Sequence, residues 1–241
     1  MRKILVASTN PGKIAEIRAM LGSDIQWVGL SDFKGIAEIK EDGETFAENA
    51  RKKALGYAKA TGLWTIADDS GLVIDAIGGE PGVESARFCD SHRRDRKARR
   101  DFLSFILCGL RVLRGKTPGA KDKDRTLLDH KNMAKVLKLL EGVPREKRTA
   151  RFVCCMCLAS PPDEWRASPV KILIETEGTL EGLITDKKIG ENGFGYDPIF
   201  FVPKLNMTVA QLTTDEKNTI SHRGNALRKL KPLLEELLKG T

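Results

Sequence analysis

The chain has 241 residues, of which 41% are apolar and 31% are charged, and this composition is typical of a soluble globular protein with one large domain or two lobes. No stretch reaches the roughly 18 apolar residues of a membrane span, and no signal-type apolar segment follows Met1, so we expect a cytoplasmic protein without a membrane partner. The net charge of +8 lies within residues 92–131, which contain 13 Lys and Arg and five Asp. In the rest of the chain 28 basic and 28 acidic residues cancel, so the body of the protein has no overall positive charge that would attract a polyanion.

The spacing of apolar residues predicts strands and helices that alternate irregularly along the chain. We expect strands at 3–8, 63–67, 71–77, 150–159 and 170–185, helices at 10–21, 45–62, 131–143 and 221–238, and a glycine-rich loop at 190–202. This order predicts an α/β fold built on a mixed sheet with a cleft. No internal repeat or low-complexity linker divides residues 1–241.

Five cysteines, an odd number, favour reduced thiols over a disulfide framework. Three of them are crowded together, and Cys154 and Cys157 have the C-x-x-C spacing of metal sites and redox pairs. Residues three apart on a strand point to opposite faces, so we interpret these cysteines as buried core.

Residues 90–131 differ in composition and residue pattern from the rest of the chain. Six Lys and Arg lie within 93–100, an apolar run resembling a helix covers 102–113, and a polar stretch with Pro and Gly at 114–125 resembles a loop. We interpret the segment as an inserted basic arm with its own helix. It is either a solvated basic helix or an apolar run buried against a dimer partner, and any binding of nucleic acid is expected only through this arm.

Two adjacent carboxylates, Asp68 and Asp69, directly follow an apolar run and precede Ser70 and Gly71. We expect the strand to end there in a tight turn, because glycine lets the backbone reverse sharply. Acids at the tip of such a turn are well placed to hold a metal or to act as a base. The alternative is an ordinary solvated turn, since Asp, Ser and Gly are common turn residues.

The first predicted strand leads Ser8, Thr9 and Asn10 into a glycine-containing loop, and Lys13 follows at the start of a helix. Backbone N–H groups, the helix dipole and an ammonium group together favour an anion. The stretch is not a Walker A loop, because the G-x-x-x-x-G-K-[ST] spacing is absent. Taken alone the signal is weak, because such a turn is common in α/β proteins.

Glu41, Asp42 and Glu44 lie just before the second predicted helix, where acids commonly satisfy the helix dipole. If Asp68 and Asp69 lie opposite them, the two clusters together suit a divalent cation that carries polyphosphate, because Mg²⁺ takes one or two carboxylates and several waters.

The loop at 190–202 combines glycine and asparagine with the rings of Phe194 and Tyr196 and the carboxylate of Asp197. An aromatic ring for stacking and a carboxylate that accepts N–H bonds are what recognition of a planar base requires. The alternative is a core strand preceded by a glycine-rich turn.

Lys217, His222 and Arg223 stand near the start of the last predicted helix. A His-Arg pair is commonly a surface feature, but here it is placed to donate hydrogen bonds to carbonyl oxygens of a base.

Six motifs occur in order: S-T-N-x-G-K, E-D-G-x-T-F-x-E-N-A, A-D-D-S-G-L, P-G-V-x-S-A-R, G-F-G-Y-D-P-I-F and E-K-x-x-I-S-H-R. Together they closely resemble the inosine triphosphate pyrophosphatase family, the Ham1/RdgB-like pyrophosphatases of noncanonical purine nucleotides. The resemblance covers nearly the whole chain outside the basic arm. It implies one domain of two lobes with a central nucleotide cleft, Mg²⁺-dependent hydrolysis of ITP, dITP and XTP to monophosphate and pyrophosphate, and a homodimer.

The resemblance also implies roles for individual residues. Asp69 becomes the general base and a metal ligand, Glu41 a second metal ligand, and Asp68 a ligand or an indirect support of the metal. The implied nucleotide contacts are Ser8, Thr9, Asn10, Lys13, Lys53 and Ser70 around the triphosphate, Phe194, Gly195, Tyr196 and Asp197 in the base loop, and Lys217, His222 and Arg223.

Selectivity is expected from the 6-oxo group of hypoxanthine and xanthine. A donor such as His222 or Arg223 can hydrogen-bond to this oxygen, whereas the amino group of adenine would place a second donor against it. Rejection of guanine, also a 6-oxo purine, does not follow from the sequence, and we expect a pocket that reads the 2-position.

The rival hypothesis is a nucleic-acid-binding protein with a vestigial nucleotide site. Intact acids at Glu41, Asp68 and Asp69 argue against it. The arm departs from the family pattern but interrupts no motif, so it bears on dimerisation and on access to the cleft.

Overall fold

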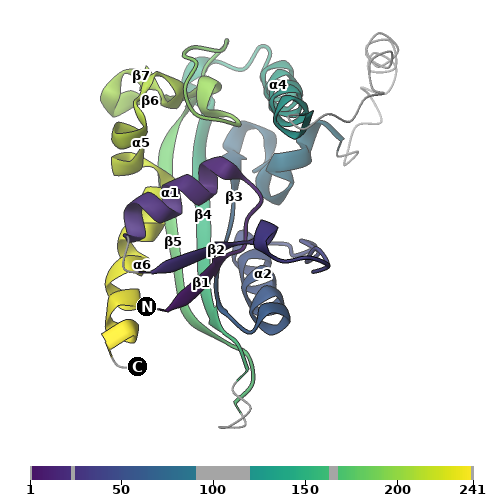
Figure 1. Ribbon diagram of the computed structural model, residues 1–241. Coiled ribbons are helices and arrows are strands. Elements are labelled where there is room, and N and C mark those ends of the chain that lie inside the picture. The colour runs from purple at the N-terminus through teal and green to yellow at the C-terminus, as the bar shows by residue number, and fades with distance from the viewer. Residues whose placement is uncertain (1, 23–24, 91–119, 163–167, 240–241) are drawn as a thin grey trace.

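The computed structural model describes residues 2–22, 25–90, 120–162 and 168–239, with the backbone alone at 120–124. A seven-stranded sheet in the order β2-β1-β3-β4-β5-β6-β7 forms its centre (Figure 1). The strands are β1 Lys3–Val6, β2 Gln26–Gly29, β3 Trp64–Ile74, β4 Thr149–Ser160, β5 Lys171–Ile184, β6 Phe200–Val202 and β7 Met207–Thr208. The first three pair in parallel and the others are antiparallel, which confirms the predicted mixed α/β sheet.

The described helices are α1 Pro11–Leu21, α2 Phe46–Thr61, α4 Ala120–Leu139, α5 Thr214–Ile220 and α6 His222–Lys239. Local sequence sets several of their ends. Asn10 caps α1 by accepting the N–H groups of Gly12 and Lys13, and Thr45 caps α2 in the same manner. Gly62 ends α2 with a φ of 68°, a conformation that glycine adopts without strain. These boundaries agree with the predicted ones.

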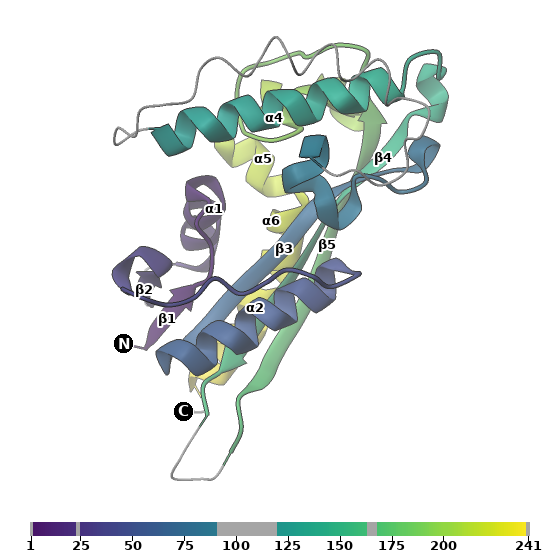
Figure 2. The same cartoon turned by 90° about the vertical axis from the view of Figure 1, so that its right-hand side faces the viewer.

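Three apolar clusters pack against the sheet, and the long strands β3, β4 and β5 connect them. On one face, α1 and α6 cover Ile4, Ile66 and Met156, and on the other α2 covers Leu5, Ala67 and other small side chains. At the far end of the same strands, α4 crosses over a third cluster (Figure 2). The segment of β3 between these clusters is therefore where a site can open.

The acidic stretch does not form a turn, so that prediction is wrong. β3 runs without a break through Asp68, Asp69, Ser70 and Gly71, and each of them pairs with a residue of β4. Gly71 is needed for close packing rather than for a reversal. A Cβ added there would lie 2.3 Å from Ser85 Oγ and 2.6 Å from a backbone oxygen.

The predicted boundary between the arm and the next helix is also wrong within the described residues. Residues 120–131 belong to α4, which continues to Leu139, instead of forming a loop before a separate helix at 131–143. The range 120–139 contains neither Pro nor Gly, so nothing in it interrupts a helix. The basic stretch 93–100 and the apolar run 102–113 lie outside the described residues.

Two further expectations concern the cysteines and membrane spans. Cys154 packs with α1 and α6 while Cys157 packs with α2, so the two thiols lie on opposite faces as predicted, and both are free and buried. Among the described helices, none is both long enough and apolar enough to cross a membrane.

Candidate active site

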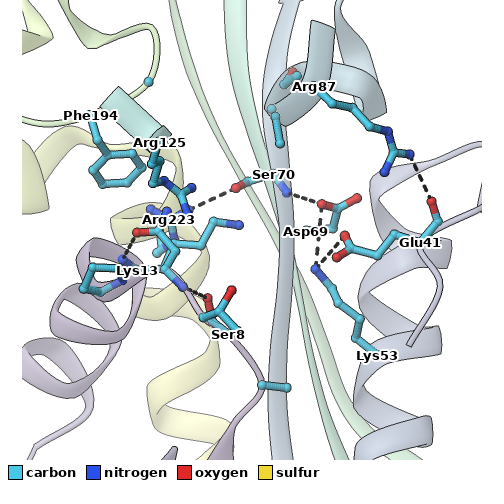
Figure 3. Close-up of a pocket in the computed structure, with 18 of the residues that line it drawn as sticks. Ser8, Lys13, Glu41, Lys53, Asp69, Ser70, Arg87, Arg125, Phe194 and Arg223 are labelled. Carbon is cyan, nitrogen blue, oxygen red and sulfur yellow. Dashed lines mark hydrogen bonds and ion pairs between the residues drawn. The ribbon is translucent and has the colours of Figure 1, made fainter. Parts of the chain in front are cut away.

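A cleft of about 650 Å³ opens beside the middle of β3 (Figure 3). Its walls come from the loop between β1 and α1, from residues within 30–41, from α2, from the short helix η3 Gly82–Asp90, from α4, from the 190–202 loop, from α5 and from the start of α6. All the residues predicted to contact nucleotide or metal line this cleft, with the exception of Asp68.

The two adjacent aspartates lie in different environments because neighbouring residues of a strand point to opposite faces. Asp68 faces α1 and α6, where Lys13 Nζ is 2.9 Å and Arg223 Nη2 3.1 Å from its Oδ2 atom. Asp69 faces α2, whose Asn49 donates to its Oδ2 at 3.0 Å. One strand therefore supplies a carboxylate to each side of the cleft.

Asp68 is 1% exposed and remains ionised. Burial alone would raise the pKa of its carboxyl group, but Lys13, Arg223 and Lys53 hold that pKa far below the usual range. Its charged contacts are cations, and Ser70 and Cys154 also donate to it. Because Asp68 is absent from the cleft wall, the geometry gives it the role of a buried counter-ion. A role of Asp68 as a metal ligand stays a prediction.

An alternating series of buried charges extends from Asp68 across the α1–α6 side. Arg223 also binds Glu16, Glu16 Oε1 lies 3.2 Å from Lys217 Nζ, and Lys217 lies 2.8 Å from Asp197 Oδ2. We call this series, from Lys13 through Asp68, Arg223, Glu16 and Lys217 to Asp197, the ion chain. It has three cations and three carboxylates, so its formal charge is zero, and each cation lies beside at least one carboxylate.

Asp69 belongs to a separate cluster with Glu41 and Lys53. Lys53 Nζ lies 2.9 Å from Glu41 Oε2 and 3.9 Å from Asp69 Oδ1, and Asn49 and Lys53 reach this point from successive turns of α2. Burial raises the pKa of Asp69 to about 6, an effect that Lys53 and Lys13 only partly offset and to which Glu41 adds. Burial acts to lower the pKa of Lys53, but the nearby carboxylates outweigh it and raise that pKa.

The Asp69 cluster suits a divalent cation. Two carboxylates converge on one ammonium group, which leaves a formal charge of −1 beside the cleft. No group of three or more His, Cys, Asp or Glu able to hold a metal occurs among the described residues. Mg²⁺ commonly needs only one or two protein carboxylates, because waters and substrate phosphates complete its coordination, so Glu41 and Asp69 fit that pattern.

The loop between β1 and α1 offers donors at the opposite wall. Asn10 uses its Oδ1 to cap α1, while its buried Nδ2 has no hydrogen-bond partner among the described residues. Ser8 Oγ accepts from Asn10 N at 3.1 Å, and the exposed Thr9 also lines the cleft. Ser70 Oγ, on β3, accepts from Arg223 at 3.0 Å. An anion entering here would meet the start of α1 and the Asn10 amide.

Residues 200–202 of the predicted 190–202 loop form β6 instead, and the remaining part of the loop is held from several sides. Asp197 is buried, accepts from Phe194 N at 3.0 Å and pairs with Lys217. Its burial raises its pKa, and Lys217 opposes that effect. Gly195 N donates to Asp129 of α4 at 3.0 Å.

Two aromatic side chains of this loop lie differently. Lys217 Nζ sits 4.3 Å from the centre of the half-buried Phe194 ring, which borders the cleft. Tyr196 is buried in the far-end core, and its hydroxyl donates to Ser85 O at 2.8 Å. Of the two rings, Phe194 is the better placed to stack on a base.

His222 and Arg223 are both buried rather than displayed on the surface. The His222 ring stacks on Phe152 at 4.8 Å, burial lowers its pKa well below 6.5, and its Nδ1 atom has no partner among the described residues. Arg223 donates to Asp68, Glu16 and Ser70, so most of its N–H groups are already bound. His222 therefore has the freer polar atom of the pair.

Sequence reasoning did not assign roles to five residues that the structure places in or beside the site: Glu16, Asn49, Arg87, Arg125 and Asp129. Helical spacing offered a signal for two of them. Glu16 lies three residues after Lys13, and Asn49 lies four residues before Lys53, so each shares a helix face with a predicted site residue. The others reach the site only through tertiary contacts.

Comparison with known proteins finds close similarity over nearly the full length. The model of the Ham1 family matches residues 4–106 and 111–233. Proteins named dITP/XTP pyrophosphatase from Desulforamulus reducens and Bacillus subtilis are each 40% identical to this chain; the matches cover 98% of it and 96% and 98% of those relatives.

Solved structures give the same result. A HAM1 protein from Coxiella burnetii is 35% identical, with a TM-score of 0.72 and coverage of 98% of this chain and 100% of that one. A nucleoside-triphosphatase, dITP/XTP pyrophosphatase, from Mycobacterium abscessus is 37% identical, with a TM-score of 0.64 and coverage of 95% and 99%.

Proposed function

The chain belongs to the Ham1 family, and we propose that it hydrolyses noncanonical purine nucleoside triphosphates, dITP, ITP and XTP, to the monophosphate and pyrophosphate. The observation that carries the proposal is the division of charge across the cleft. One wall is a neutral ion chain beside an aromatic ring, suited to a base, and the other is a net acidic cluster suited to a cation that accompanies phosphates.

Asp69 is the proposed general base. Its carboxylate lines the cleft and is ionised at neutral pH, so it can accept a proton from the attacking water. Asn49 and Lys53 hold the carboxylate in place from α2. The activated water attacks the α-phosphorus, the bond from that phosphorus to the bridging oxygen breaks, and pyrophosphate leaves.

Glu41 and Asp69 are the proposed Mg²⁺ ligands. When bound, Mg²⁺ supplies positive charge that neutralises the polyphosphate. Lys13, at the start of α1, adds a second positive charge near the leaving group if it turns from Asp68 toward the phosphates. Removal of divalent cations with EDTA should abolish turnover, and Mg²⁺ should restore it.

The base end is proposed to read the 6-oxo group through the free Nδ1 atom of His222, with Phe194 as the stacking platform. Arg223 then acts mainly by holding Asp68, Glu16 and Ser70 in position. With the proton of the neutral imidazole on Nδ1, a 6-amino group would place a donor against that N–H, which disfavours adenine.

The test is pyrophosphate release from a panel of ITP, XTP, dITP, GTP, ATP and a pyrimidine triphosphate with Mg²⁺. ITP and XTP should be cleaved with kcat/KM at least about tenfold above ATP. Release of single orthophosphates, or equal rates on ATP and ITP, would exclude the proposed function.

A cytoplasmic location, where nucleoside triphosphates are used, and a homodimeric state are part of the same proposal. Light scattering of the purified chain tests the dimer directly. The alternative of a nucleic-acid-binding protein rests on the basic stretch 93–100, which lies outside the described residues.

A further inference from the structure

Arg125 is a cation in the cleft that the proposed chemistry does not use. It lies on α4, lines the cleft, and has a buried Nε atom without a hydrogen-bond partner in the described part of the chain. Figure 3 shows its side chain beside Phe194, across the cleft from Asp69, Glu41 and Lys53. Arg125 therefore belongs to the base end of the site rather than to the phosphate end.

Asp129 fixes the position of α4 relative to this end. One helical turn after Arg125, its carboxylate accepts the N–H of Gly195 at 3.0 Å, so the helix and the base loop are joined directly. Burial raises the pKa of Asp129, an effect that the N–H of Gly195 and the charge of Arg125 partly offset. The contact ties the part of α4 that carries Arg125 to the loop that carries Phe194.

Arg125 also differs from the neighbouring cations in its lack of a counter-ion among the described residues. Lys217 and Arg223 are neutralised within the ion chain, but Arg125 forms no ion pair with any described residue. A buried N–H without an acceptor is unfavourable, so the site gains stability from a ligand that presents an acceptor there. A guanidinium group can only donate, so the ligand atom must be an oxygen or an unprotonated nitrogen.

The purine 2-position supplies such an atom in one of the candidate bases. Xanthine carries an oxygen at this position, hypoxanthine a hydrogen, and guanine an amino group. His222 and Arg125 approach the base end from different elements, α6 and α4, so two separate edges of one base can be read. Xanthine also loses a ring proton more readily than hypoxanthine, and a charged acceptor strengthens the bond to a guanidinium group.

We propose that Arg125 is a specificity-determining residue that donates a hydrogen bond to the 2-oxo group of xanthine and places a donor against the 2-amino group of guanine. The proposal rests on the proposed function, and it gives a physical reason why GTP would be disfavoured although it shares the 6-oxo group.

The test compares Arg125→Gln, Arg125→Lys and the control Lys138→Gln, which removes the same charge from an exposed position near the end of α4. Pyrophosphate release gives kcat/KM for XTP, dITP and GTP. Arg125→Gln should lower the value for XTP about tenfold or more and change that for dITP less than about threefold. The ratio of kcat/KM for GTP to kcat/KM for XTP should therefore rise. Arg125→Lys should retain part of the preference, and Lys138→Gln should match the unaltered chain.

Equal losses on XTP and dITP, or no change on either, would overturn the proposal. Melting temperatures identify a variant that fails to fold, and in that case Arg125→Lys decides the question. If the unaltered chain releases no pyrophosphate from any nucleotide, the proposed function fails. The affinities for xanthosine monophosphate and inosine monophosphate, measured by calorimetry, then still test the role of Arg125. Arg125→Gln should lower the affinity for xanthosine monophosphate relative to inosine monophosphate about tenfold, and an unchanged ratio of the two affinities would overturn the proposal.

Discussion

Replacing Glu16 with Gln is a sensitive test of the ion chain, because it removes one charge from the middle of a buried, neutral series. Gln keeps the size of the side chain and still offers an oxygen to Lys217 or Arg223. The series would then have three cations and two carboxylates, and its excess charge would remain in a nearly dry environment, since Glu16 is only 7% exposed.

The expected loss follows from the geometry. At 3.2 Å, the attraction between Glu16 and Lys217 is about 5 kcal/mol at an effective dielectric constant of about 20. The desolvation that Glu16 no longer suffers offsets part of this, and removal of one partner from buried pairs generally costs about 3–5 kcal/mol. We therefore expect Glu16→Gln to lower the free energy of unfolding by about 3 kcal/mol or more while the chain still folds.

Urea denaturation at neutral pH measures this loss, and three further variants identify its cause: Glu175→Gln, Lys217→Met and the double variant Glu16→Gln with Lys217→Met. Glu175→Gln breaks the exposed ion pair with Arg51 and should cost less than about 1 kcal/mol. Glu16→Gln combined with Lys217→Met restores neutrality, so the double variant should be at least about 1 kcal/mol more stable than the sum of the two single losses predicts. Equal effects of Glu16→Gln and Glu175→Gln, or strict additivity in the double variant, would refute the electrostatic account.

Three other outcomes are expected. Asp69→Asn should lower kcat about a hundredfold or more while the chain melts at a similar temperature, and near-normal turnover would remove Asp69 as the base. Because the folded state keeps His222 neutral, the unfolded state takes up an extra proton below pH 6.5, which should lower the unfolding free energy by up to about 1.4 kcal/mol per pH unit; the raised pKa of Asp69 acts in the opposite direction, so the contribution of His222 is measured as the difference in slope between the unaltered chain and His222→Gln, and equal slopes would contradict it. Gly71→Ala should destabilise the protein by about 1–3 kcal/mol in urea, since its Cβ would meet Ser85 and a backbone oxygen; an unchanged transition would contradict the packing argument.

Local signals in the sequence predicted much of the fold. Asn10 and Thr45 are side chains that cap a following helix, and Gly62 allows the left-handed conformation that ends one, so the ends of α1 and α2 follow from neighbouring residues. The error at Gly71 has the opposite origin. Glycine marks both turns and close packing, and only the tertiary approach of Ser85 distinguishes the two.

Most of the residues that were predicted to form the site do line the cleft, but their environments could not be predicted. Two adjacent aspartates are visible in the sequence, whereas the low pKa of Asp68 comes mainly from Lys13 and Arg223, which are distant along the chain. Glu16 looks like an ordinary helical residue until α1 and α6 pack together. Arg125 was assigned to a loop of the arm, and its place in the cleft depends on the continuity of α4.

The long strands β3, β4 and β5 also bear on how the molecule loses its structure. Each of them contributes to the clusters on both sides of the cleft, so melting one end of the sheet would remove hydrogen-bonding partners and apolar neighbours from the same strands at the other end. Calorimetry should therefore record one heat-absorption peak, with the van't Hoff enthalpy close to the calorimetric enthalpy. A nucleotide bound in the middle would shift that single peak upward as a whole, without splitting it in two.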